Sequence, residues 1–141
     1  MIEPRDIAIR YYSRMRNEAK AAYAFVTLLQ RTNRRKYETK EDAFQAIREE
    51  IDIQGNKCEE WVLYYKRDSA LLDIYKSSEA DIKKYCLDIE NCLTEIYKIL
   101  RSADTYDTQN LHNQLTTIRN VFKNCIAIAE RELEKLGIQV Q

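Results

Sequence analysis

One apolar stripe runs through residues 8–29, AIRYYSRMRNEAKAAYAFVTLL. Its members recur at spacings of 4, 3, 4, 3, 4 and 3, at Ala8, Tyr12, Met15, Ala19, Ala22, Val26 and Leu29. This period keeps one face of an α-helix turned toward a core. Pro4 suits the first helical turn, where its missing N–H leaves no bond unmade. The sequence therefore predicts a long first helix that begins near Pro4 and ends near Asn33.

Three further stripes with the same period follow. They comprise Cys58, Val62, Tyr65, Ser69 and Leu72, with Trp61 and Tyr75 on the flank; Ile82, Cys86, Ile89, Leu93, Ile96 and Leu100; and Leu111, Leu115, Ile118, Phe122, Cys125, Ala129 and Leu136. The connections between the four segments are short, which makes consecutive helices antiparallel neighbours. We expect an all-α fold, an up-down-up-down four-helix bundle, in a single domain over residues 1–141.

Residues 40–54 carry a shorter stripe and predict an extra short helix. Thr39 is a suitable N-cap, with Asp42 as the reciprocal acid of a capping box. Gly55 then interrupts the pattern, and we favour a break there over one continuous helix through residues 40–77. Ser78 and Asp81 form another capping signature, residues 102–107 read as a loop, and Gly137 predicts the end of the last helix.

Composition narrows the classes of protein that the chain can represent. It has 2 Gly and 1 Pro in 141 residues, too few to form the many turns of a β-sandwich or a β-barrel. No run approaches the ~20 apolar residues of a membrane span, and the N-terminus lacks the apolar region of a secretory signal, so we expect a cytoplasmic protein with no membrane partner. The four cysteines are then expected to be reduced, buried thiols.

The sequence offers little for catalysis. His112 is the single histidine, and the two glycines stand apart, so metal clusters, Cys–His pairs and phosphate-binding loops lack their residues. We expect His112 to be solvated or to lie at a helix start. We predict no catalytic residue, no metal site and no cofactor, and a protein that is not an enzyme.

The charges are unevenly distributed although their total is zero. Residues 1–40 hold ten basic and four acidic side chains, whereas residues 41–104 hold nine basic and fifteen acidic ones. The candidate partner- or phosphate-binding residues are Arg10, Arg14, Arg31, Arg34, Arg35 and Lys36. Tyr11 and Tyr37 lie beside them in the sequence and are candidates for stacking on bases.

Two functions remain open at this stage. The chain has ten tyrosines, a residue type enriched in protein interfaces. We expect a non-enzymatic helical-bundle interaction or regulatory protein that binds another protein and self-associates. The alternative is a nucleic-acid-binding accessory protein that uses the basic first helix and the 31–36 loop. The neutral total charge weighs against this alternative, because nonspecific binding rests on neutralising phosphates.

Overall fold

The computed structural model describes residues 3–55, 57–68 and 79–140, and within these ranges the regular structure is entirely helical. The helices are α1 (Pro4–Arg34), α2 (Lys40–Gln54), α3 (Lys57–Asp68), α4 (Glu79–Ile99) and α5 (Thr108–Lys135). The predicted all-α class is therefore confirmed. None of the described helices combines the length and the apolar character needed to cross a membrane.

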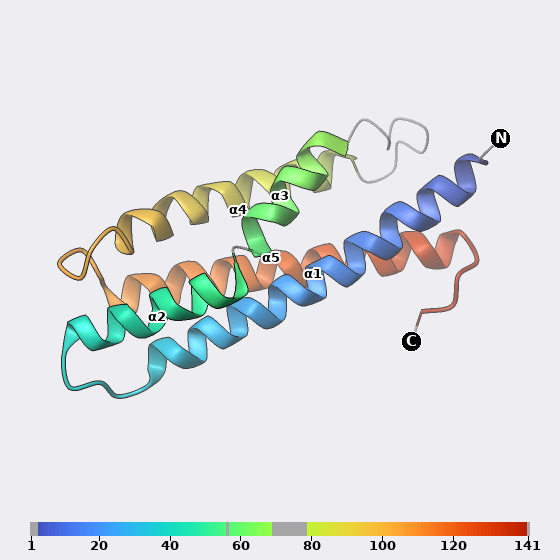
Figure 1. The fold of residues 1–141 in the computed structure, drawn as a ribbon. Helices are drawn as coiled ribbons and strands as arrows, with labels where there is room; N and C mark the ends of the chain where they lie inside the picture. Colours follow the sequence, from blue (N-terminus) through green and yellow to red (C-terminus); the bar gives the residue numbers. More distant parts are fainter. Residues whose placement is uncertain (1–2, 56, 69–78, 141) are drawn as a thin grey trace.

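The long helices α1 and α5 form an antiparallel pair that runs the length of the molecule (Figure 1). Every predicted stripe residue of α1 is buried, as are those of α5 up to Ala129. A polar edge joins the same two helices. Arg16 Nε lies 3.0 Å from Glu130 Oε1, and Gln30 Nε2 donates to Thr116 Oγ1 at 2.9 Å. The apolar stripes bring the helices together, and the polar edge favours one axial register.

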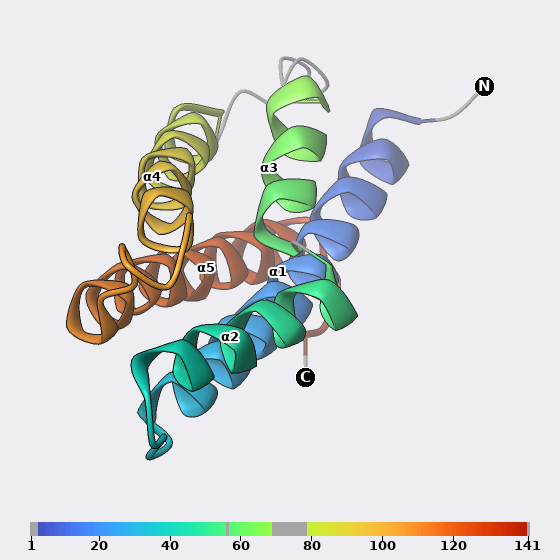
Figure 2. The same ribbon diagram turned by 60° about the vertical axis from the view of Figure 1, so that its left-hand side comes forward.

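The chain reverses direction after α1, after α3 and after α4. Helices α2 and α3 return along α1, α4 runs back, and α5 returns to the end where the termini lie (Figure 1). The two connections 35–39 and 100–107 therefore lie at the same end of the molecule. Helix α2 packs chiefly on α1, whereas α3 contacts both α1 and α4 (Figure 2).

The break at Gly55 is confirmed. Helix α2 ends at Gln54, and Gly55 follows with φ of 70°, a left-handed conformation that glycine adopts without strain. The N–H of Gly55 still bonds the carbonyl oxygen of Ile51 at 2.8 Å, which closes the last turn of α2. The change of direction here lets α2 stay on α1 while α3 reaches α4, and residues 40–54 form the separate short helix that the sequence predicts.

The other predicted helix ends that fall within the described residues are also found. Thr39 Oγ1 accepts a hydrogen bond from the N–H of Asp42 at 3.1 Å. At the end of α5, the N–H of Ile138 bonds the oxygen of Leu133 and that of Gly137 bonds Glu134, the pattern of a Schellman motif. The predicted cap at Ser78, the stripe positions Ser69 and Leu72 and the flanking Tyr75 lie outside the described residues.

The placement of Trp61 was predicted wrongly. We expected it on the flank of its stripe, yet its side chain is 2% exposed and packs edge-on against Phe122 of α5. The reason is that α3 packs against both α1 and α4, and Trp61 also reaches α5, so the buried face of α3 is wider than a single stripe. The four cysteines are free and buried, as predicted. Burial raises the pKa of the Cys58 thiol to about 12 and also raises that of Cys125.

Candidate functional site

The six predicted basic residues do not form one site. Arg10 and Arg14 lie in the first half of α1, whereas Arg31, Arg34, Arg35 and Lys36 lie at its C-terminal end. Arg10 is exposed and makes no hydrogen bond or ion pair with the described part of the chain. The structure therefore separates the candidates into two groups with different surroundings.

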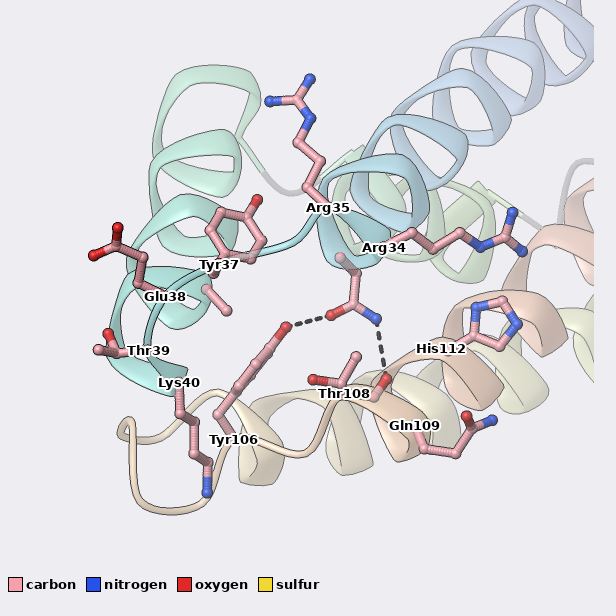
Figure 3. A pocket seen from close by; sticks show the side chains of 12 residues that line it. Arg34, Arg35, Tyr37, Glu38, Thr39, Lys40, Tyr106, Thr108, Gln109 and His112 are labelled. Atoms are coloured by element: carbon pink, nitrogen blue, oxygen red, sulfur yellow. Dashed lines mark hydrogen bonds between the residues drawn. The ribbon is translucent and has the colours of Figure 1, made fainter.

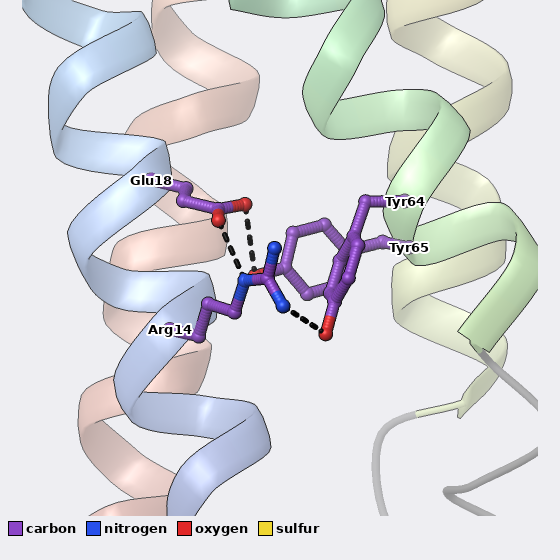
Figure 4. A network of polar contacts seen from close by, with 4 residues as sticks. All are labelled: Arg14, Glu18, Tyr64 and Tyr65. Carbon is purple, nitrogen blue, oxygen red and sulfur yellow. Dashed lines mark hydrogen bonds and ion pairs between the residues drawn. The ribbon is translucent and has the colours of Figure 1, made fainter.

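Arg14 is engaged within the protein (Figure 4). Its Nε lies 2.7 Å from Glu18 Oε1, its Nη1 donates to Tyr64 Oη at 2.7 Å, and its guanidinium carbon lies 3.8 Å from the centre of the Tyr64 ring. The hydrogen bond to Glu18 is the main cause of the raised pKa of Arg14. Tyr65 Oη also donates to Glu18, at 3.4 Å. Arg14 thus links α1 to α3 and is a structural residue.

The two tyrosines expected to stack on bases also make contacts within the protein. Tyr11 is 5% exposed and packs edge-on against Tyr12 and Tyr65, although it is not a member of the predicted stripe. Tyr37 is half-buried, and its hydroxyl donates to the carbonyl oxygen of Thr32 at 2.8 Å. The Tyr11 ring is therefore not available at the surface for base stacking.

The other four candidates form a group that we call the basic end: Arg31, Arg34, Arg35 and Lys36. All four side chains are exposed, and none of them forms an ion pair or a hydrogen bond with the residues that the structure describes. Basic residues are favourable at the C-terminus of a helix because they face its partial negative charge. That interaction leaves their outer hydrogen-bond donors available for a ligand.

A cavity of about 500 Å³ opens beside the basic end (Figure 3). One wall comes from residues 33–43 and the other from residues 106–112, so the cavity lies where the first and the last connections of the fold meet. Arg34, Gln109 and His112 lie on one side of it in Figure 3, and Lys40 lies on the other. Arg35 and Lys36 differ here, because Arg35 lines the cavity and Lys36 does not.

Buried hydrogen bonds fix the walls of this cavity relative to each other. Asn33, which is 3% exposed, accepts a bond from the Tyr106 hydroxyl through Oδ1 and donates through Nδ2 to the oxygen of Thr108 at 3.0 Å. Burial raises the pKa of Tyr106, which keeps its hydroxyl proton in place for this bond. Lys40 Nζ donates to the oxygen of Asp104 at 3.0 Å. Helix α1 is thereby fastened to the start of α5, and α2 to the preceding loop.

Sequence reasoning identified Arg34 and Arg35 but missed Asn33, Lys40, Tyr106 and His112 as members of the site. The predicted order and direction of the helices could have identified these residues. If consecutive helices alternate in direction, the connection after the first and the connection before the last must lie at one end. Pairing residues 33–40 with residues 106–112 on this ground would have located the cavity.

The described residues contain no group of three or more metal-ligating side chains. Comparison of the chain with protein-family models, with curated proteins and with solved structures finds no match.

Proposed function

We propose that this protein is a non-enzymatic interaction module that binds an acidic segment of another protein through the basic end. One observation carries the proposal: Arg31, Arg34, Arg35 and Lys36 are exposed together and have no ion-pair partner among the described residues. Other arginines of α1 are committed to internal bonds, Arg14 to Glu18 and Arg16 to Glu130. In α1, Arg10 and Lys20 are also exposed, but only the basic end brings four such cations together within six residues.

An acidic protein segment suits this surface. Arginine pairs with a carboxylate through two parallel hydrogen bonds, and charge complementarity accelerates association between proteins. The basic end also fits the phosphates of a nucleic acid, which is the alternative function. We rank it second because Tyr11 is buried and the chain carries equal numbers of acidic and basic side chains.

The proposal includes the finer architecture, the location and self-association. Taken together, α2 and α3 form one member of an up-down-up-down four-helix bundle, with α1, α4 and α5 as the others. Reduced cysteines agree with a cytoplasmic location. A second copy is one of the partners that the proposal admits, because Glu41, Asp42, Glu49 and Asp52 of α2 are exposed acids.

The test measures binding by fluorescence anisotropy with three labelled probes: a twelve-residue peptide rich in Glu and Asp, a single-stranded RNA and a double-stranded DNA. The basic-end variant changes Arg31, Arg34, Arg35 and Lys36 to Gln. The matched control changes four exposed cations elsewhere to Gln, namely Lys20, Lys84, Arg101 and Lys123. Both variants lose the same charge.

We expect the peptide to bind the wild-type protein and the control, with an affinity that falls as salt is added, and to bind the basic-end variant at least about tenfold more weakly. Equal loss in both variants would mean that total charge, and not the basic end, governs binding. Submicromolar binding of RNA or DNA in physiological salt, lost in the basic-end variant, would replace the proposal with the alternative.

A further inference from the structure

A small apolar pocket lies where residues of all five helices meet. Helix α2 packs on α1 and α4 packs on α5, but within the described residues α2 and α4 do not pack closely on each other (Figure 2). Residues of both helices line a pocket of about 40 Å³ at this place. Its floor is formed by buried aliphatic side chains, among them Val26 of α1 and Leu115 and Ile118 of α5. We call this space the apolar pocket.

The mouth of the apolar pocket lies between α2 and α4. Arg48 and Ile51 of α2 are half-buried lining residues, and Tyr97 of α4 is an exposed one. The Tyr97 hydroxyl donates a hydrogen bond to Glu59 Oε2 of α3 at 2.6 Å, which holds the ring at the mouth. The pocket is therefore apolar at its floor and reaches solvent between two helices that leave a gap.

Arg48 is the charged residue among those described to line the apolar pocket. Arginine buries its aliphatic stem along apolar surface and keeps its guanidinium in water. The half-buried Arg48 thus lines the pocket with its stem and carries its charge at the mouth. It forms no ion pair or hydrogen bond with the described part of the chain, so its fork of N–H donors is open to a carboxylate.

The volume of the apolar pocket limits what it can hold. A water molecule takes up about 10–15 Å³ of such space, so a pocket of about 40 Å³ has room for about three water-sized groups. The branched end of a leucine side chain has this size, whereas a cavity that binds benzene measures about 150 Å³. Affinity grows with the apolar surface that is buried, so a group this small suits one anchor of a larger ligand.

We propose that the apolar pocket takes a leucine-sized aliphatic side chain of the acidic partner segment, while a carboxylate next to that side chain pairs with Arg48. The size and polarity of the occupant rest on the pocket, whereas its place in an acidic segment rests on the function proposed above. The pocket gives the segment a sequence requirement. Acidic residues alone satisfy the basic end, but the pocket selects a segment with an aliphatic residue beside an acid.

The first test titrates the protein with small probes and follows the methyl groups of Val26, Leu115 and Ile118 by two-dimensional ¹H–¹³C NMR. N-acetyl-leucine carries both the aliphatic side chain and a carboxylate. N-acetyl-leucinamide lacks the charge, and N-acetyl-alanine lacks the branched side chain. We expect N-acetyl-leucine to shift these methyl groups saturably, and each of the other two to need at least about tenfold higher concentration for the same shift.

The second test uses two labelled twelve-residue acidic peptides that differ at one central position, which is Leu in one and Ala in the other. Fluorescence anisotropy should show the leucine peptide binding about tenfold more tightly, because the pocket buries the additional carbon atoms. Ile51→Trp narrows the mouth and should abolish this preference while leaving the affinity of the alanine peptide unchanged.

A pair of variants tests the role of Arg48 in binding the leucine peptide. Arg48→Gln should weaken this binding about fivefold through the loss of one charge-assisted contact. Lys84→Gln is the matched control, because Lys84 is an exposed cation about two turns of α4 before Leu93 that does not line the pocket. Its effect should stay within about twofold.

The basic-end variant separates this inference from the proposed function, because it should weaken both peptides and keep the preference for leucine. Equal binding of the two peptides, or a leucine preference without shifts of the pocket methyl groups, would overturn the inference and leave the proposed function standing. An equal response to N-acetyl-leucinamide would overturn the pairing of a carboxylate with Arg48. Methyl shifts with N-acetyl-leucine but no binding of either peptide would contradict the proposed function and rule out the acidic segment as the carrier.

Discussion

The two arginine-rich parts of α1 have similar sequences and opposite surroundings. In its first half, Arg14 bonds Glu18 and Tyr64, and Arg16 bonds Glu130, so each side chain connects α1 to another helix. At its C-terminal end, Arg31, Arg34 and Arg35 are exposed and unpaired among the described residues. A count of basic residues treats both parts alike. The structure shows that Arg14 and Arg16 connect α1 to other helices, whereas the side chains of its C-terminal end, like that of Arg10, have no partner among the described residues.

The first prediction concerns two thiols of the buried interior, and it carries the largest effect. Burial holds the pKa of the Cys58 and Cys125 thiols above the usual value of about 8.5. The unfolded chain therefore releases these protons first as the pH rises. Stability is fully present below about pH 8.5, and the two thiols together should lower the free energy of unfolding by about 3 kcal/mol per pH unit above it.

Urea unfolding at pH 8, 9 and 10 under reducing conditions measures this loss. The control is the double variant Cys58→Ala and Cys125→Ala, which is less stable at pH 8 but should show a clearly shallower decline. If the wild type and the double variant lose stability with the same slope, the thiols are not the groups that respond to alkali.

The second prediction tests how tightly the buried face of α1 is packed. Ala22 is 0% exposed, whereas Ala24 is exposed on the same helix. Ala22→Leu should lower the free energy of unfolding by about 1–3 kcal/mol, because added methyl groups have no room in a filled core. Ala24→Leu should change it by less than about 0.5 kcal/mol. Equal tolerance of both substitutions would mean that the buried face is assigned wrongly.

The third prediction compares the two groups of arginines directly. Arg16→Gln removes the ion pair to Glu130, and it should destabilise the protein by about 0.5–1 kcal/mol. Arg34→Gln removes no described contact and should have a smaller effect on stability. Urea midpoints of the two variants, measured side by side, provide the comparison. A larger loss for Arg34→Gln would show that the basic end is structural after all.

The fourth prediction carries the smallest effect. Changing Arg31, Arg34, Arg35 and Lys36 together to Gln removes both their favourable interaction with the C-terminus of α1 and their mutual repulsion, and these contributions oppose each other. The free energy of unfolding should stay within about 0.5 kcal/mol of the wild-type value. Thermal unfolding followed by circular dichroism checks this. A marked loss would place these side chains among the structural residues.

Periodicity predicted the helices because each buries a stripe that repeats locally. It failed for Tyr11 and Trp61 because these residues lie where a helix meets more than one neighbour, so the buried face extends past the stripe. The break at Gly55 was predictable because the conformational freedom of glycine is a local property. The cavity was harder to predict, since Asn33 and Tyr106 bond across 73 positions of the sequence. Local sequence shows where the arginines are, but contacts between helices determine which of them already have a partner within the protein.

The separation of α2 from α3 at Gly55 bears on how long the cavity keeps its shape. Helix α2 buries Ala43 and Ile47, and is otherwise held by half-buried Phe44 and Ile51 and by the bond from Lys40. A helix with so small a buried surface opens at a free energy below that of global unfolding, and its amide hydrogens exchange correspondingly faster. Lys40 and Ala43 also line the cavity, so each opening of α2 removes one wall. If a partner binds beside this cavity, as we propose, each opening of α2 gives it a way to dissociate that does not depend on how well the arginines hold it.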